Sequence, residues 1–206
     1  MSDRYPGDSR KPKEQTPKQP SSPQKSKDYD KNESDTREIF MKSIILIGMP
    51  GAGKSTAGVI LAKALRMRFV DTDLLIQERT GRLLQEILNR EGPAAFHAIE
   101  EETILSLRPK NAVIATGGSV VLSDAAMAHL KSTGVVVYLE ISYGEMERRL
   151  KNITTRGIVL LPGQSLRQMY EERVPLYEKY ADITIDCSKE DFETVVGNVI
   201  ETLPPA

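Results

Sequence analysis

Apolar residues along the chain alternate between short continuous runs and longer stretches with helical spacing. The run SIILIG at 43–48 is almost continuously apolar and ends at a glycine, which is typical of a strand buried on both faces of a sheet. Four further short runs have a similar character. The predicted strands are 43–48, 68–73, 112–118, 135–141 and 181–187.

Helical spacing fills most of the intervals between these runs. In 55–66, apolar residues that include Val59 and Leu65 recur at the spacing of one helix face. Gly81 predicts a helix break and Pro93 a helix start. The predicted helices are 55–66, 74–92, 93–107, 123–132, 143–152, 165–179 and 191–203. Strands that alternate with helices predict an α/β domain whose parallel sheet is covered on both faces.

The first forty residues have a different composition. They hold five prolines, nine Lys or Arg and eight Asp or Glu, and almost no aliphatic side chain before Ile39. Such a segment cannot bury enough apolar surface to offset its ordering entropy, so we predict a disordered tail at 1–40 and a domain at 41–206. Translation that begins at Met41, a linker and a weak partner-binding arm remain open alternatives for the tail.

Charge and cysteine content exclude several classes of protein. Lys and Arg total 28 and Asp and Glu 29, which gives a net charge of −1 and argues against a dedicated nucleic-acid binder. A lone cysteine, Cys187, excludes an internal disulfide framework, and two histidines leave little room for a histidine metal site. No apolar run approaches the length of a membrane span or a signal peptide, so we expect a cytoplasmic protein without a membrane partner.

The segment Gly48–Ser55 fits the phosphate-binding pattern G-x-x-x-x-G-K-[ST] and lies between a predicted strand and a predicted helix. Its glycines allow backbone N–H groups to turn toward phosphate oxygens, and the helix N-terminus adds partial positive charge. Lys54 would reach the β- and γ-phosphates, and the Ser55 hydroxyl would coordinate Mg²⁺. The residues predicted to bind the nucleotide are Gly51, Ala52, Gly53, Lys54, Ser55 and Thr56.

Two carboxylates, Asp71 and Asp73, end the second predicted strand. The carboxyl ends of parallel strands form the ligand-binding edge of an open sheet, and alternate strand positions face the same side. One carboxylate could hold a magnesium-bound water while the other orients or deprotonates an acceptor hydroxyl. The structural alternative is that Asp73 caps a helix over 74–80.

Motifs along 41–203 resemble those of the shikimate kinase family, small-molecule kinases related in fold to the nucleoside monophosphate kinases. They are GMPGAGKST, VDTD, EGPAAFHAIEEE, ATGGS, VVVYLE and ERVPLYEKYAD, in this order. The resemblance implies a three-layer P-loop kinase fold with a five-stranded parallel sheet, a mobile lid and a substrate-binding helical segment. It implies transfer of the γ-phosphoryl of MgATP to a hydroxyl of a compact, carboxylate-bearing polyol.

The same resemblance implies roles for individual residues. Asp73 would bind the substrate diol and act as the base or position the hydroxyl, while Asp71 would lie near the magnesium. Gly117 and Gly118 would let the backbone approach the substrate closely, a role suited to glycine. Arg173, in ERVPLY, would bind the substrate carboxylate.

The lid and the nucleotide-base region depart from the usual pattern of the family. Arg156 falls in the lid, where the family places an arginine against the ATP phosphates, but Arg-Pro-Leu-Leu is replaced by Arg156–Val159. Such an arginine supplies charge in the transition state and excludes water on closure. The adenine-contacting loop of the family falls near Ser188–Phe192, where this sequence keeps few of the residues that are usual in the family.

Two further departures concern the acceptor. Ser119 stands where a third glycine is usual, and His97 occupies the place of a second substrate-binding arginine. Imidazole lacks the planar, permanently charged fork of arginine, which could lower affinity for a carboxylate by about tenfold to a hundredfold. Glu100, one helical turn after His97, could pair with it and favour its protonated form. The alternative is that His97 only packs.

Three functions follow from this sequence. The leading hypothesis is a monomeric, cytoplasmic shikimate kinase that uses ATP and Mg²⁺ and serves aromatic precursor synthesis. The second is a related kinase for a different small hydroxylated acid, motivated by His97, Ser119 and the altered lid. The third is a nucleotide-binding regulator without catalysis, against which the intact Lys54 and Asp73 argue.

Overall fold

The structure, a computed structural model, describes residues 42–151, 158–161, 163–189 and 191–204. The predicted tail at 1–40 and Met41 lie outside the described residues. Arg156 and most of the predicted lid lie outside them as well. The roles assigned to these segments therefore remain predictions.

Five strands form one parallel sheet, which confirms the predicted fold class. Their order across the sheet is β2-β3-β1-β4-β5, so the strand before the phosphate-binding pattern is central. All five residues of β1 are buried, as its continuous apolar run predicts. The strands are β1 (Ser43–Ile47), β2 (Arg68–Asp71), β3 (Ala112–Ala115), β4 (Gly134–Glu140) and β5 (Ile183–Asp186).

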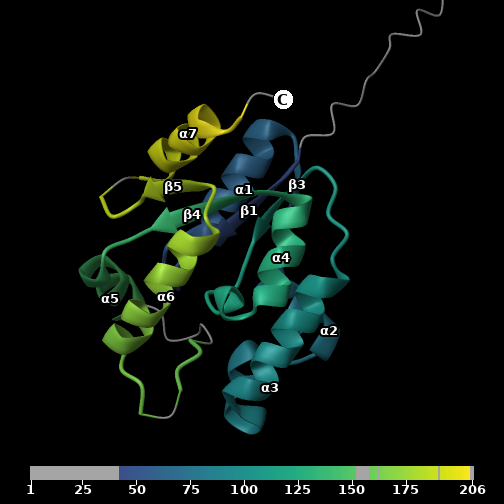
Figure 1. The fold of residues 1–206 in the computed structure, drawn as a ribbon, viewed down its shortest axis with the longest axis vertical. Helices are drawn as coiled ribbons and strands as arrows, with labels where there is room; N and C mark the ends of the chain where they lie inside the picture. The colour runs from purple at the N-terminus through teal and green to yellow at the C-terminus, as the bar shows by residue number, and fades with distance from the viewer. Residues whose placement is uncertain (1–41, 152–157, 162, 190, 205–206) are drawn as a thin grey trace, which may run out of the picture. The chain divides into compact units, whose positions relative to one another are not determined.

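Helices cover both faces of this sheet (Figure 1). Helices α1 and α7 pack against each other on one face, and α4 and α6 lie against β4 on the other. Helix α3 packs against α2 and α4. The helices are α1 (Lys54–Leu65), α2 (Thr72–Thr80), α3 (Leu84–Ser106), α4 (Asp124–Thr133), α5 (Tyr143–Lys151), α6 (Leu166–Tyr180) and α7 (Phe192–Thr202), with a short 3-10 turn, η1 (Val120–Leu122).

Glycine and proline set the helix boundaries where the sequence predicts them. Gly81 ends α2 in the left-handed conformation, with φ of 65°. Helix α3 is kinked at Gly92, where φ is 80° and ψ is 174°, and its second half begins at Pro93. Proline at the start of a helical segment has no N–H to leave unpaired, so the kink agrees with the predicted start.

The junction between β2 and α2 differs from the prediction. The strand ends at Asp71 and the helix already begins at Thr72, so Asp73 lies on the first helical turn rather than at the strand end. Asp71 is the N-cap residue: its Oδ1 accepts the N–H groups of Asp73 at 3.0 Å and of Leu74 at 3.3 Å. Asp71 rather than Asp73 thus caps this helix, because its side chain satisfies the first free N–H groups of α2.

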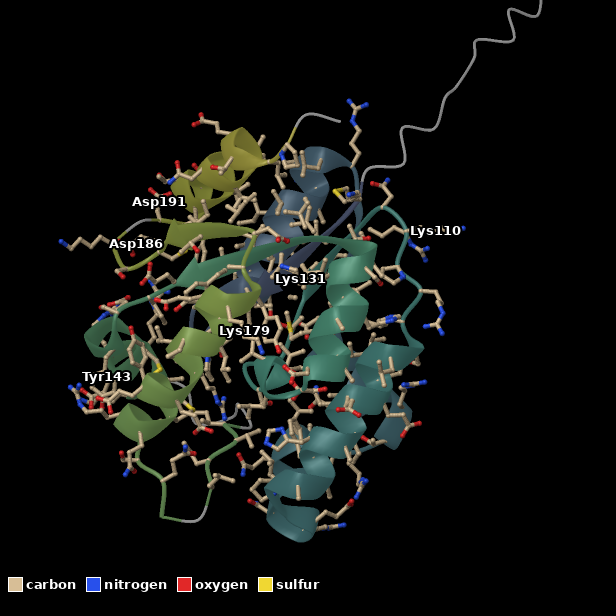
Figure 2. The ribbon with its side chains drawn as sticks, viewed as in Figure 1. Lys110, Lys131, Tyr143, Lys179, Asp186 and Asp191 are labelled. Carbon is tan, nitrogen blue, oxygen red and sulfur yellow. The ribbon has the colours of Figure 1, made fainter. Side chains whose placement is uncertain are left out.

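Polar contacts join helix α4 to the edge of the sheet that is formed by β4 and β5. Lys131 on α4, labelled in Figure 2, donates to the Tyr180 carbonyl and to Asp182 Oδ1, both at 2.8 Å. The other oxygen of Asp182 accepts the N–H of Val136 on β4 at 2.9 Å. This contact ties α4 and β4 to the segment that enters β5. None of the described helices is long and apolar enough to cross a membrane.

Candidate active site

The loop between β1 and α1 has the geometry of a phosphate-binding loop. Gly51 and Gly53 have φ of 81° and 93°, in the left-handed region that glycine tolerates best. Gly53 is the N-cap residue of α1, and no side chain caps its N–H groups. The loop therefore leads a helix N-terminus, with its partial positive charge, to the carboxyl edge of the sheet.

Lys54 begins α1 and turns back over this loop. Its side-chain ammonium donates to the carbonyls of Gly48 at 2.7 Å and Met49 at 2.9 Å. The residue is buried, so a permanent positive charge is held inside the loop rather than in solvent. Such a charge is suited to compensate phosphate oxygens.

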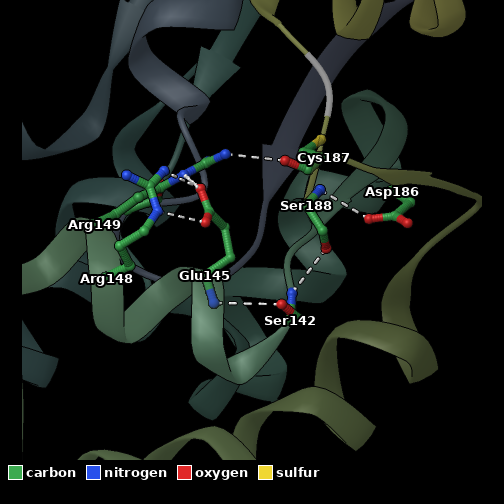
Figure 3. Close-up of polar contacts among 8 residues, drawn as sticks. Ser142, Glu145, Arg148, Arg149, Asp186, Cys187 and Ser188 are labelled. Carbon is green, nitrogen blue, oxygen red and sulfur yellow. Dashed lines mark hydrogen bonds and ion pairs between the residues drawn. The ribbon is translucent and has the colours of Figure 1, made fainter.

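Arg149 on α5 contacts the phosphate-binding loop and also Glu145 and Cys187, and the last two contacts are drawn in Figure 3. Its guanidinium donates to the Gly51 carbonyl at 3.2 Å, to the Cys187 carbonyl at 3.0 Å and to Glu145 Oε1 at 2.5 Å. Hydrogen bonds from Arg148 and Arg149 lower the pKa of Glu145 to about 2, so this carboxylate stays charged at neutral pH. The phosphate-binding loop is thus anchored to α5 and to the end of β5, a role that the sequence analysis did not assign to Arg149.

Phe192, the last residue of the segment predicted to contact adenine, lies beside this loop. The ring of Phe192, 40% exposed, packs so closely on Gly53 that a Cβ there would meet Phe192 Cε1 at 2.5 Å. Glycine is therefore favoured at position 53 by its φ, and any larger residue there would also have to displace the exposed Phe192 ring.

A cavity of about 340 Å³ opens in front of the loop, and we call it the Lys54 cavity. Its lining includes Lys54, Ser55, Asp71 and Asp73, so the displaced helix start at Thr72 does not separate the two carboxylates. A hydroxyl and two carboxylates are the hard oxygen ligands that Mg²⁺ prefers. The described residues hold no cluster of three His, Cys, Asp or Glu able to bind a metal alone. This donor set fits Mg²⁺ as P-loop kinases hold it, through few protein ligands completed by phosphates and water.

A smaller cavity of about 20 Å³ adjoins it, and we call it the Arg173 cavity. Asp73 and Gly118 line both cavities, and Arg173 lines the smaller one together with Gly117 and Phe96. The structure thus brings Asp73, Gly117, Gly118 and Arg173 together, although they come from three separate parts of the chain. A cation on one wall and a carboxylate on another suit a ligand with both a carboxylate and hydroxyl groups.

The guanidinium of Arg173 is buried and makes hydrogen bonds to backbone. Nη2 donates to the Val159 carbonyl at 2.7 Å and Nη1 to the Gly118 carbonyl at 3.3 Å. Nε has no hydrogen-bond partner among the described residues. A buried guanidinium with an unused N–H group retains the capacity to bind an anion.

Glu100 is a buried carboxylate beside this cavity. Its Oε2 accepts the Ser119 hydroxyl at 2.7 Å, while Oε1 has no partner in the described part of the chain. A Cβ on Gly117 would lie 2.2 Å from Oε1 and 3.0 Å from Asp73 Oδ1. Glycine at position 117 is thus required by the close approach of two carboxylates of the protein itself.

His97 lies apart from the other predicted acceptor residues. It lines a different cavity, also of about 340 Å³, between α3 and the η1–α4 segment, together with Glu100 and Ser119. Its Nδ1 is 3.8 Å from Glu100 Oε2, so the predicted pairing with Glu100 is present at long range. His97 lines neither cavity that contains Asp73.

The remaining predicted nucleotide ligands are on the loop and the helix that follows it. Gly51 and Ala52 are buried within the loop, and Thr56 is exposed on the first turn of α1. Arg156 lies outside the described residues. The sequence assigned Glu100 only a pairing with His97 and did not assign Arg149 to the site, because the contacts of Glu100 with Ser119 and of Arg149 with Gly51 join distant segments. Glu100 lies within the quoted motif EGPAAFHAIEEE, which is the signal that could have found it.

Comparisons with known proteins place the chain in a family. A family model described as shikimate kinase matches residues 50–204. The shikimate kinase of Thermodesulfovibrio yellowstonii is 41% identical over 164 residues, which cover 78% of this chain and 94% of that protein. The shikimate kinase of Mycobacterium avium is 40% identical over 163 residues, which cover 78% and 92%.

Solved structures agree with these relatives. The structure of shikimate kinase from Acinetobacter baumannii in complex with shikimate matches with a TM-score of 0.71 and 30% sequence identity, over 78% of this chain and 92% of that one. Shikimate kinase from Aquifex aeolicus matches with a TM-score of 0.66 and 31% identity, over 77% and 94%.

Proposed function

The chain belongs to the shikimate kinase family, and on this premise we propose that it transfers the γ-phosphoryl group of MgATP to the 3-hydroxyl of shikimate. One observation carries the proposal: Asp73 lines both the Lys54 cavity and the Arg173 cavity. A single carboxylate thus faces the space for nucleotide phosphates and the small cavity of about 20 Å³ in which Arg173 would meet the carboxylate of an acceptor. This is the arrangement that an in-line transfer between two bound substrates needs.

On the nucleotide side, the loop binds phosphates through the N–H groups of Gly51 and Gly53 and through Lys54, while the N–H of Ala52 donates to the Met49 carbonyl and shapes the turn. Ser55 and Thr56 add hydroxyl donors at the start of α1. Arg156 is proposed to complete this side, because an arginine there stabilises the charge that develops on the transferred group. Exclusion of water from the phosphates strengthens each of these interactions.

Mg²⁺ would be held by the side-chain oxygens of Ser55 and Asp71, residues that both line the Lys54 cavity. When bound, the ion neutralises negative charge on the phosphate oxygens.

On the acceptor side, Asp73 orients the attacking hydroxyl and accepts its proton. The hydroxyl oxygen bonds to the γ-phosphorus as the bond to the β–γ bridging oxygen breaks, and ADP leaves. Arg173 binds the acceptor carboxylate through its charge, and Gly117 and Gly118 let the acceptor approach the backbone. We propose that His97, which lies near Glu100, also helps to bind the carboxylate of the acceptor.

A second candidate is a kinase of the same mechanism for a different small hydroxylated acid. The position of His97 favours it, because this side chain lines a cavity separate from that of Arg173 and Asp73. Arg173 then faces the acceptor as a permanent cation, but the second arginine that the family pattern predicts is replaced by His97. The third candidate, a nucleotide-binding regulator, has no observation in its favour, since Lys54 and Asp73 are both in the site.

The test is a coupled ADP-release assay with shikimate and with a panel of related hydroxy acids. High turnover with shikimate supports the proposal, and ATP hydrolysis stimulated only by another acid supports the second candidate. No release of ADP with any acid, despite ATP binding, would support the third candidate, the nucleotide-binding regulator.

Lys54→Ala links the activity to this site. It is expected to lower turnover by about 10²- to 10³-fold, because it removes the charge held over the phosphate loop. Lys63→Ala is the matched control, since Lys63 is an exposed lysine on the same helix. Turnover of Lys54→Ala near that of Lys63→Ala would place the ATP site elsewhere. Thermal unfolding of both variants checks that the fold is retained.

We further propose that the protein acts in the cytoplasm as a monomer, and that its partners are ATP and the acid acceptor rather than nucleic acid or membrane. The near-neutral net charge of −1 supports the absence of a nucleic-acid surface. Sedimentation of the purified protein tests the oligomeric state.

A further inference from the structure

We propose that Tyr177 is a positioning residue for the acceptor, because its hydroxyl holds the Gly118 carbonyl and thereby fixes the Gly118–Ser119 peptide and frees Arg173 to bind the acceptor carboxylate. The inference rests on the proposed shikimate kinase activity and names a residue that acts through its neighbours. Tyr177 itself lines none of the three described cavities.

The Gly118 carbonyl receives two donors from a single helix face. Tyr177 Oη donates to it at 2.5 Å and Arg173 Nη1 at 3.3 Å. The two residues are four positions apart on α6, so their side chains lie one above the other. A carbonyl oxygen has two lone pairs and can accept both bonds. The shorter bond comes from Tyr177, so the tyrosine rather than the arginine sets the direction of this carbonyl.

The direction of this carbonyl matters for the site. A trans peptide is planar, and its C=O and N–H groups point in opposite directions. With the Gly118 carbonyl held toward α6, the N–H of Ser119 is held in the opposite direction. Gly118 and Ser119 both line the Arg173 cavity. Rotation of their peptide would therefore change the polar surface that the acceptor meets.

The hydrogen bond also determines what Arg173 is free to do. Arg173 already donates to the Val159 carbonyl, and its contact to Gly118 is long. Without the tyrosine hydroxyl, Arg173 would be the remaining described donor to the Gly118 carbonyl. A partly buried carbonyl that loses one of its two donors attracts the remaining donor, so the guanidinium would be drawn toward it and away from an acceptor carboxylate.

Tyr177 is held in the geometry and protonation state that this role needs. The residue is fully buried, and its ring stacks on that of Tyr138, with centroids 5.1 Å apart and an interplanar angle of 18°. Burial raises the pKa of the Tyr177 hydroxyl above its usual value. The hydroxyl therefore remains a donor over the pH range in which the enzyme works.

Tyr138 provides a matched control. It is buried in the same stack, but its hydroxyl has no hydrogen-bond partner among the described residues. Tyr138→Phe and Tyr177→Phe each remove one buried oxygen and keep the ring. The differences expected between them are the hydrogen bond to the Gly118 carbonyl and the interaction of the hydroxyl with Arg173, which belong to Tyr177 and not to Tyr138.

The experiment measures KM for shikimate, KM for ATP, kcat and thermal unfolding for the full-length protein and both variants. Tyr177→Phe is expected to raise KM for shikimate about five- to tenfold, as loss of one buried hydrogen bond predicts, with KM for ATP within about twofold of wild type. Tyr138→Phe is expected to stay within about twofold of wild type in both constants, and both variants to fold.

Three results would overturn the inference. They are a Tyr177→Phe variant whose KM for shikimate equals that of Tyr138→Phe, a rise in KM for ATP as large as that for shikimate, and failure of Tyr177→Phe alone to fold, which would make its role structural. The wild-type measurement is separate: if the wild-type protein has no turnover with shikimate, the proposed activity fails, and the inference that rests on it fails with it.

Discussion

Glu100 is the residue at which two departures from the family pattern meet. Its buried carboxylate accepts the hydroxyl of Ser119 at 2.7 Å and has His97 at 3.8 Å on the same oxygen. Its other oxygen, beside Gly117, has no partner among the described residues. A buried carboxylate is costly unless its oxygens are paired, so this position favours an added cation.

His97→Arg is expected to supply that cation. The guanidinium is longer than imidazole and permanently charged, and it would add a second cation to the acceptor side from the position of His97 on α3. If the acceptor is shikimate, KM for shikimate should fall by about tenfold, the value of one charge-assisted hydrogen bond after side-chain ordering. Steady-state kinetics with shikimate as the varied substrate measure the change.

His97→Lys separates charge from geometry, because it adds a charge without the planar fork. If KM for shikimate falls further in His97→Arg than in His97→Lys, the guanidinium binds the acceptor carboxylate through two hydrogen bonds. Weaker turnover of shikimate in His97→Arg would show that His97 is adapted to a different acid, and the second candidate function would replace the first.

At the scale of elements, the turn from β2 into α2 combines a helix cap with a predicted metal contact. Asp71 pairs in the sheet with Ala115, caps α2 through Oδ1 and lines the Lys54 cavity. The two roles use different properties of one side chain. The cap needs an oxygen acceptor, whereas the metal contact needs a negative charge.

Asp71→Asn and Asp71→Ala should therefore differ in stability but not in activity. Asparagine is as good an N-cap as aspartate, so Asp71→Asn should unfold near the wild-type temperature. Asp71→Ala should lose about 1 kcal/mol of stability, or about 2–4 °C in Tm. Both variants should need more Mg²⁺ for half-maximal turnover. A wild-type Mg²⁺ requirement in Asp71→Asn would restrict Asp71 to its capping role.

Helix and strand ends that carry a local signal can be predicted from the sequence, and ends decided by tertiary contacts cannot. Gly81 and Pro93 mark boundaries through backbone conformation alone, and the structure has boundaries at both. Asp71 and Asp73 are both good capping residues, and strand pairing with β3 decides between them. Val59 was predicted on the apolar face of α1 but is 50% exposed. Helix α1 has apolar residues on several sides. The side that carries Gly58 is the buried one, because Gly58 has no side chain and packs closely on Phe69.

The same distinction holds for the site. The phosphate-binding loop is contiguous in sequence, so its residues and its position between strand and helix could be predicted from one motif. The Arg173 cavity is assembled from β2–α2, α3, β3–η1 and α6, and the resemblance to a family was needed to connect them. The bond between Tyr177 and Gly118 spans 59 residues and leaves no pattern in the sequence.

At the scale of the whole molecule, the site depends on the large hydrophobic core beneath it. The buried residues of that core run from Ile44 in β1 to Val199 in α7. A smaller cluster, which includes Ile76 and Phe96, supports α2 and α3 on the acceptor side. The large core also includes residues of η1 and α6, such as Val121 and Tyr177, so both sides of the site rest on it, and the smaller cluster adds support for α2 and α3.

Deletion of residues 1–40 and deletion of residues 191–206 should consequently have opposite outcomes. The tail precedes every described buried residue and has a composition that cannot contribute much core, so its removal should leave Tm within about 2 °C and turnover near wild type. Helix α7 buries Val195, Val196 and Val199 against the core, and each buried valine contributes about 1.5 kcal/mol or more. Their sum approaches the net stability of a typical domain, so the second deletion should abolish folding. Calorimetry of both truncations measures the contrast, and a fall of several degrees on removal of 1–40 would show that the tail docks on the domain.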